Sequence, residues 1–397
     1  MIQGTFGVSG VATTMKKPVR VFRFSTALMC AASLAACAGP ASDPVIQEAA
    51  RARVTQPLPP LAMPAAMPPA PAPMTRPRVV EADPMLASRI GALGRAFNGD
   101  VGIAVRDVHE GWTASYNGGA LFPQQSVSKL WVAITLFDQI DAGRIHLTDA
   151  VTVTASDMTL FHQPIRSELR GGVLRTTVGD LLYRSMTQSD NTANDILLRK
   201  VGGPDAVRAV LASGGVRSVR FGPGERLLQS GTAGLSWRPQ YSVGNAFYTA
   251  RSALPASVRE AAFSRYLADP VDGASPDGIT DGLAKLKRGE LITPESAQRL
   301  IAVMYASKTG PSRMKAGSSP GWLIAHKTGT GQNLEGTVAG YNDIGLVTAP
   351  DGSTYAVAIL IGRTRQGIPT RQQLMADVVR AVVDYENRSA YRAYGSR

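Results

Sequence analysis

Strand-like segments lie at the two ends of the folded region of this 397-residue chain, and helical patterns fill the stretch between them. The strand-like runs cover residues 101–105, 112–116, 322–330, 341–347 and 354–362. Turn residues at 109–111 and 351–352 separate two neighbouring pairs of these runs. The distribution favours one sheet assembled from both ends of the chain, with a helical region inserted between its halves.

Apolar residues at helical spacing predict the helices of this inserted region and of its flanks. The expected helices cover residues 85–97, 126–141, 177–188, 191–201, 206–211 and 372–385. The chain is long enough for one large domain or two modest ones, and its 44% hydrophobic content supplies a sizeable core.

The first 37 residues have the pattern of an export signal. A basic segment, for which Met15 is the natural start, precedes an apolar run at 24–36 that is too short to span a bilayer as a permanent helix. The run ends at Cys37 in a sequence that resembles a bacterial lipobox, where the cysteine is lipidated. A secretory signal cleaved near Ala36 and a single-span anchor are the alternatives. We expect an exported, periplasmic protein held to the membrane by a lipid on Cys37.

Composition divides the remaining chain and excludes several kinds of partner. Residues 38–84 are rich in Pro and Ala, a composition that indicates an extended spacer. A proline-rich ligand for a partner protein is the alternative. The folded domain is expected at 85–389, with a short tail at 390–397. Basic and acidic residues are mixed there, so the net charge of +12 indicates no nucleic-acid partner. The only cysteines, Cys30 and Cys37, precede this domain, which excludes a disulfide or a cysteine metal site within it.

The first motif that carries chemistry is S-x-x-K at residues 126–129, ahead of the apolar run 130–137. If Ser126 begins the helix, Lys129 lies one turn further along the same face. The amino end of a helix favours developing negative charge, and a desolvated amine nearby can accept the hydroxyl proton. An N-cap serine beside a solvated lysine is the alternative interpretation of this motif on its own.

Two further motifs contain groups suited to acyl transfer. Ser189 and Asn191 of an S-D-N tripeptide offer a hydroxyl that can relay a proton and an amide that can orient a substrate or a lysine. Lys327 and Thr328 of K-T-G, at the end of a strand-like run, suit a substrate carboxylate. Gly329 lets a substrate backbone lie alongside the strand. Helix capping and a strand-end turn are the structural alternatives.

Together, S-x-x-K, S-D-N and K-T-G occur in the order and at roughly the separations of the class A β-lactamase and penicillin-binding protein superfamily, which this chain resembles over residues 85–389. The resemblance implies an α/β (α+β) fold of the β-lactamase/transpeptidase type. In that fold an antiparallel sheet from both chain ends is flanked by helices, an all-helical domain is added, and the active site lies between the two parts.

The same resemblance implies roles for the motif residues. Ser126 would be the acylated nucleophile, Lys129 a proton acceptor or relay, and Ser189 the group that carries a proton to the β-lactam nitrogen. Asn191 would hold the amide side chain of the substrate. The backbone N–H groups of Ser126 and Thr330 would form the oxyanion hole.

The resemblance also implies which residues would bind the substrate carboxylate and which would line the cleft. Lys327 and Thr328 would bind the substrate carboxylate, which Arg313, fourteen residues before Lys327, would also reach. Phe161 lies where the family often has an aromatic residue walling the cleft. A surface arginine and a core phenylalanine are the alternative interpretations of these two positions.

Deacylation distinguishes a β-lactamase from a penicillin-binding protein, and the chain has a candidate base for it. Glu225 lies 36 residues after Ser189, close to the family position of the glutamate that activates water. Gln229 replaces the asparagine that helps to hold this water and offers the same amide on a longer arm. Arg226 stands where the family often has a proline in a cis bond, so the loop is expected to be built differently.

The segment 230–275 is a further departure, because it is much longer than usual for the family. Residues 257–268 have helical spacing, and Trp237, Tyr241, Phe247 and Tyr248 supply aromatic anchors. We expect this insert to pack near the active-site loop and to brace it, although narrowing of the substrate range is also open.

The sequence therefore predicts a monomeric serine β-lactamase of class A type, acting on small β-lactams through Ser126 and Glu225. It requires no cofactor and no metal, since the four histidines form no H-x-x-x-H pattern. One alternative is a D,D-peptidase or related serine hydrolase that acts on peptidoglycan. A non-catalytic cell-wall-binding lipoprotein is the other, but it has no need of four intact motif side chains.

Overall fold

The computed structural model describes residues 81–395, and its centre is a six-stranded antiparallel sheet. The strands follow the order β2-β1-β10-β9-β7, and β8 pairs with β9. Their bounds are β1 Val101–Asp107, β2 Thr113–Tyr116, β7 Leu323–Thr330, β8 Asn333–Leu334, β9 Thr337–Thr348 and β10 Thr354–Thr364. The predicted strands are thereby confirmed, as is the hairpin turn between β9 and β10.

Strands from the two ends of the described residues meet in the middle of this sheet. β1 pairs with β10 so that Val101 lies opposite Ile361 and Asp107 opposite Tyr355. Side chains alternate between the two faces of β1, and Ile103 and Val105 join one core while the small Gly102 faces Phe122 and Pro276 on the other side. The prediction of a sheet assembled from both chain ends is confirmed.

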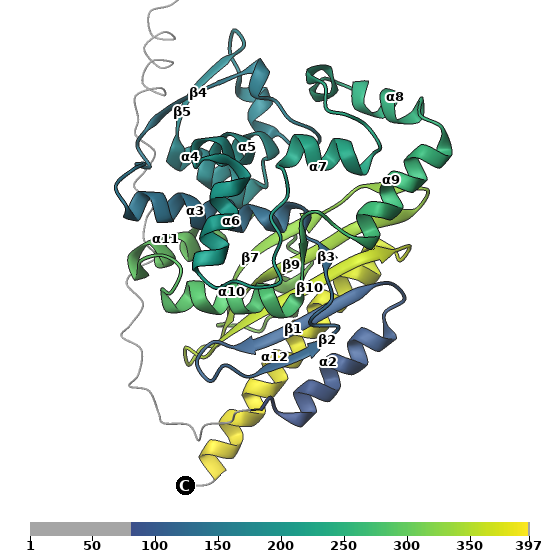
Figure 1. The fold of residues 1–397 in the computed structure, drawn as a ribbon. Coiled ribbons are helices and arrows are strands. Elements are labelled where there is room, and N and C mark those ends of the chain that lie inside the picture. Colours follow the sequence, from purple (N-terminus) through teal and green to yellow (C-terminus); the bar gives the residue numbers. More distant parts are fainter. Residues whose placement is uncertain (1–80, 396–397) are drawn as a thin grey trace, which may run out of the picture. The chain divides into compact units, whose positions relative to one another are not determined.

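Helices cover both faces of the sheet (Figure 1). Helices α2 (Pro84–Ala96) and α12 (Ile368–Gly395) pack together on one face, and α10 (Pro276–Arg288) and α11 (Pro294–Tyr305) lie on the other. The Asp83 carboxylate caps α2 by accepting from the first free backbone N–H groups. No helix among residues 81–395 is long and apolar enough to cross a membrane.

The helical region stands above the α10 face of the sheet (Figure 1). It contains α3 (Lys129–Asp141), α4 (Val178–Tyr183), α5 (Asn191–Lys200), α6 (Gly203–Ser213) and α7 (Glu225–Thr232). It also carries an antiparallel hairpin of β4 (Ala150–Thr154) and β5 (Val173–Thr177), in a stretch where the sequence indicated only polar residues. The region is therefore mainly, but not entirely, helical.

Short elements connect these parts. β3 (Phe122–Pro123) pairs with β6 (Gly273–Ala274). Single turns of 3₁₀ or π helix cover η1 Gln125–Ser128, η2 Ala155–Asp157, η3 Pro164–Glu168, η4 Arg184–Gln188, η5 Pro239–Ser242 and η6 Met314–Gly317.

The long insert forms two helices, α8 (Ala246–Ser252) and α9 (Ala256–Ala268). The structure confirms the predicted helix at 257–268 as α9, whereas α8 was not predicted. Phe263 and Tyr266 of α9 pack with Leu228 of α7 and Ala339 of β9 in a small separate core. These contacts favour the bracing role of the insert, because they tie the helix of Glu225 to the sheet.

Candidate active site

The nucleophile turn η1 joins β3 to the buried helix α3. Ser126 lies in this 3₁₀ turn, which runs directly into α3, so the serine precedes the α-helix that it was expected to begin. Gln125 before it adopts a left-handed conformation with φ 54°, which is uncommon for a residue with a side chain. Backbone strain of this kind is often found at functional sites.

Lys129 is completely buried and brings the candidate catalytic groups together. Its Nζ donates to Ser126 Oγ at 2.6 Å and to Asn191 Oδ1 at 2.6 Å, and it forms an ion pair with Glu225 Oε1 at 3.0 Å. The Ser189 carbonyl oxygen lies 3.3 Å away. The nucleophile, the S-D-N turn and the candidate general base therefore meet at one ammonium group.

The S-D-N segment follows the π turn η4 and begins α5. Ser189 has φ 60° and presents its hydroxyl to Lys327, whose Nζ donates to Ser189 Oγ at 2.8 Å. The Asp190 carboxylate caps α5 by accepting from the Ala193 N–H. Asn191 also donates from Nδ2 to the Leu160 carbonyl, so both ends of its amide are engaged and it orients Lys129.

Strand β7 places the K-T-G motif against the nucleophile turn. A Cβ at Gly329 would lie 2.6 Å from the Gln124 carbonyl oxygen, so only glycine allows this close approach. Thr328 Oγ1 lies 2.7 Å from Thr309 Oγ1. Burial lowers the pKa of Lys327 well below its usual value, and the positive charges of Lys129 and Arg313 act in the same direction.

Arg313 lies behind the end of β7 and is buried. Its guanidinium donates to the Gly329 carbonyl at 3.0 Å and to Thr330 Oγ1 at 2.7 Å, and it stacks on the Tyr341 ring. Arg313 is therefore not a surface residue, and its charge is held at the end of the K-T-G strand, next to Gly329 and Thr330.

Glu225 begins α7, and hydrogen bonds hold both its backbone N–H and its side chain. The Asp195 carboxylate, one helical turn after Asn191, accepts from the Glu225 and Arg226 N–H groups at 3.0 and 3.4 Å. Burial and, secondly, the charge of Glu225 together raise the pKa of Asp195 to about 6. Gln229, one turn later on α7, donates to Glu225 Oε2 at 3.2 Å.

The first turn of α7 has no cis peptide bond, and every peptide bond among residues 81–395 is trans. Arg226 donates to the Ser156 and Met158 carbonyls and stacks over Trp237 of the insert. The arginine thus anchors this turn through its side chain.

Phe161 is 36% exposed and has φ 60°, which excludes the interpretation as an ordinary core residue. Its ring meets Phe247 edge-on at 5.0 Å and lies 6.0 Å from Tyr248, both in α8 of the insert. The insert therefore contacts this candidate wall residue as well as α7.

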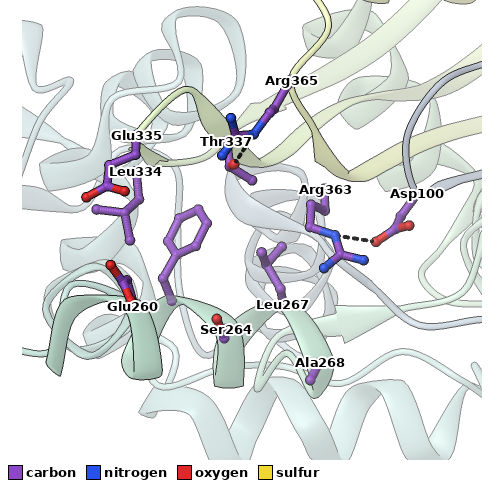
Figure 2. A pocket seen from close by; sticks show the side chains of 11 residues that line it. Asp100, Glu260, Ser264, Leu267, Ala268, Leu334, Glu335, Thr337, Arg363 and Arg365 are labelled. Atoms are coloured by element: carbon purple, nitrogen blue, oxygen red, sulfur yellow. Dashed lines mark hydrogen bonds and ion pairs between the residues drawn. The ribbon is translucent and has the colours of Figure 1, made fainter. Parts of the chain in front are cut away.

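A separate hollow of about 470 Å³ lies between α9 and the far ends of β8 and β10 (Figure 2). Its lining includes Ser264 and Leu267 of α9, Leu334 of β8 and Arg363 of β10. None of the three motifs contributes a side chain to it. This hollow is therefore distinct from the candidate active site.

Sequence reasoning missed three residues around the site: Gln125, Asp195 and Gln332. Asp195 had a detectable signal, because it lies four residues after Asn191 on the same helix. Gln125 and Gln332 are glutamines next to motifs, and nothing in their spacing indicates which side chains they meet. Cys37, the predicted lipidation site, lies outside the described residues, within which no group of three or more His, Cys, Asp or Glu side chains could hold a metal ion.

Comparison with known proteins decides the family. A model described as the β-lactamase enzyme family matches residues 85–385. The chain belongs to the β-lactamase enzyme family. This match covers most of the chain and includes all three motifs.

Two curated relatives of this β-lactamase family member come from Pseudomonas aeruginosa. β-Lactamase VEB-1 is 23% identical over 76% of this chain and 90% of its own length. Extended-spectrum β-lactamase PER-1 is 26% identical over 76% of this chain and 88% of its own length. The crystal structure of an ancestral class A β-lactamase is 28% identical, with a TM-score of 0.58 over 76% of this chain and 99% of that one. The class A resemblance and fold class inferred from the sequence are confirmed.

Proposed function

We propose that this protein hydrolyses the amide of β-lactams through an acyl-enzyme on Ser126, which a water activated by Glu225 then releases. One observation carries the proposal: Lys129 Nζ lies 2.6 Å from Ser126 Oγ and 3.0 Å from Glu225 Oε1. A nucleophile and a carboxylate base that meet at one buried ammonium can serve both halves of an acyl-transfer cycle.

Acylation begins with attack of Ser126 Oγ on the lactam carbonyl. The serine proton passes to Lys129 Nζ as Lys129 gives one of its own protons to Glu225, and the new Oγ–C bond forms as the carbonyl becomes an oxyanion. The N–H groups of Ser126 and Thr330 are the proposed oxyanion donors, because Gly329 allows β7 to lie directly against the nucleophile turn. One such donor contributes roughly 3–4 kcal/mol to transition-state stabilisation.

The lactam C–N bond breaks when its nitrogen receives a proton. Ser189 Oγ, which accepts from Lys327 Nζ, is the proposed donor. It would recover a proton from Glu225 through Lys129, so that the proton removed from Ser126 ends on the nitrogen and Glu225 is again a carboxylate. Lys327 and Thr328, with Arg313 beside Thr330, are the proposed carboxylate-binding groups. Phe161 is the proposed aromatic wall residue, and Asn191 keeps Lys129 in position.

Deacylation requires a water molecule that attacks the ester carbon of the acyl-enzyme. Glu225 would take a proton from this water, and Ser126 Oγ would recover one as the ester bond breaks. Gln229 holds Glu225 Oε2 while Lys129 holds Oε1. These two contacts, together with the hydrogen bond from Lys129 to Ser126, support the proposal that Glu225 serves the release of the product.

The test compares penicillin turnover by the purified protein and its Glu225→Ala variant, with intact-protein mass as the readout. We expect the wild type to turn over and the variant to remain acylated. Glu260→Ala, which removes an exposed glutamate of α9, is the matched control and should turn over normally. A wild type that stays acylated would instead indicate a penicillin-binding D,D-peptidase, and no adduct on either protein would contradict both functions.

Export and lipid attachment at Cys37 remain a proposal, which rests on the basic segment, the apolar run and the lipobox-like sequence. Labelling of the full chain with radioactive palmitate in cells tests it, with Cys37→Ala as the comparison. Equal labelling of the two chains would contradict attachment at Cys37. The proposed monomer is tested by light scattering of the purified protein.

A further inference from the structure

A chain of buried side-chain hydrogen bonds runs from the insert to the candidate base. The Tyr266 hydroxyl donates to Asp272 Oδ1 at 3.0 Å and accepts from Gln125 Nε2 at 2.5 Å. The Gln125 Oε1 atom accepts from Gln229 Nε2 at 3.0 Å. Gln332 then donates from Nε2 to both Gln229 Oε1 at 3.0 Å and the Gln229 carbonyl at 2.7 Å.

All donors in this chain point the same way, and its two ends determine that direction. The Asp272 carboxylate also accepts from the Gln125 N–H at 2.8 Å, so at neutral pH its oxygens act as acceptors and the Tyr266 hydroxyl must donate to it. At the other end, the main-chain carbonyl of Gln229 can only accept, so Gln332 must present its amide nitrogen. The amides of Gln125 and Gln229 are thereby held in one of their two orientations.

The orientation of the Gln229 amide matters because it decides which atom faces Glu225. In the observed arrangement Gln229 Nε2 donates to Glu225 Oε2 at 3.2 Å. If the amide turned over, its oxygen would face the carboxylate, and two acceptors without a shared proton would repel each other. Glu225 would then be displaced from its ion pair with Lys129.

Close packing fixes the chain of hydrogen bonds in place. The three glutamines, Tyr266 and Asp272 are all more than nine-tenths buried. The Gln125 side chain lies against two glycines, since a Cβ at Gly331 or Gly340 would lie within 3.0 Å of it. Water therefore has little access to compete for these hydrogen bonds.

We propose that Gln332 is a positioning residue for deacylation, and that Tyr266 and Asp272 of the insert act with it to orient the Gln229 amide toward Glu225. The inference rests on the proposed function and assigns the insert a part in the reaction. Within residues 81–395, the hydrogen bonds of the Gln332 side chain go to Gln229 and not to Ser126 or Lys129. Its effect should therefore fall on release of the acyl-enzyme and not on its formation.

The test measures acylation and deacylation of the purified full chain separately, by stopped-flow with a chromogenic cephalosporin and by intact mass. Gln332→Met keeps the volume and removes the donor, whereas Gln332→His keeps an N–H donor near the ε position. Tyr266→Phe breaks the same chain at its far end. Gln373→Met, at an exposed position of α12, is the matched control.

We expect Gln332→Met to slow deacylation by about tenfold while acylation changes by less than about threefold. Gln332→His should restore deacylation to within about threefold of the wild type, and Tyr266→Phe should slow it by roughly threefold to tenfold. The control should behave as the wild type.

If Gln332→Met slows acylation and deacylation equally, or if Gln332→His does not restore the deacylation rate, Gln332 has a structural role only and the inference is overturned. An unchanged deacylation rate in both Gln332→Met and Tyr266→Phe would also overturn it. If the Gln332 variants do not fold, the deacylation rate of Tyr266→Phe alone tests the inference. A wild type that never releases its acyl group would instead overturn the proposed function, and the inference with it.

Discussion

Replacement of Asp195 by asparagine should change how the stability of this protein depends on pH. The pKa of Asp195 is raised to about 6 by burial and by the charge of Glu225, against a usual value near 3.9 in an unfolded chain. The folded protein therefore holds this proton more tightly than the unfolded chain does. The resulting contribution to stability is complete below about pH 4 and is lost as the pH rises through about 6.

The size of this effect follows from the shift. A difference of about two pKa units corresponds to at most about 3 kcal/mol between pH 4 and pH 7. Asp195→Asn cannot titrate, and it keeps an oxygen that can accept from the Glu225 N–H. Asp272 has a similarly raised pKa of about 6, but it is present in both proteins, so its contribution cancels in the comparison.

The assay is urea unfolding of both proteins at half-unit steps from pH 4 to pH 7.5. Relative to Asp195→Asn, the wild type should lose stability progressively across this range. A difference that stays constant with pH would refute the reasoning. It would mean that the two backbone N–H donors to Asp195 offset its burial completely.

Two further substitutions test the packing of the insert and an exposed ion pair of the sheet. Phe263→Ala should destabilise the protein by about 3–5 kcal/mol in urea unfolding, because this buried ring joins α9 to Leu228 and Ala339; a cost below about 1 kcal/mol would contradict the bracing role. Arg363→Ala removes an exposed ion pair with Asp100 at the rim of the hollow (Figure 2) and should cost less than about 1 kcal/mol, with unchanged β-lactam turnover. A larger cost, or altered turnover, would show that this pair is coupled to the rest of the fold.

The sequence was sufficient for the sheet and the three motifs because both depend on local patterns. Nearly continuous runs of buried residues that include Val and Ile define β1, β9 and β10. The motif around Ser126 has few alternative interpretations once the other two motifs are present. The hairpin of β4 and β5 was missed although Val151 and Val153 alternate with threonines in β4, because each strand has only five residues and β5 shows no such alternation.

The hydrogen-bond partners of individual polar residues could not be obtained in this way. Gln332 and Gln229 are separated by more than 100 residues, and only the folded arrangement of α7 against β7 and β9 brings their amides together. Phe161 was open to two interpretations for the same reason. Its exposure depends on how α8 packs beside it, and α8 itself was not predicted.

The pairing of β1 with β10 also determines when the protein can fold. Val101 finds its partner Ile361 only after nearly the whole chain has been synthesised, and β1 has no neighbour other than the short β2 until then. Pairing over such a long sequence separation is slow, because the entropy of closing the intervening loop is lost before the contacts form. Folding of the sheet must therefore follow synthesis, and a chain that ends before residue 354 is left with the inner edge of β1 open to aggregation.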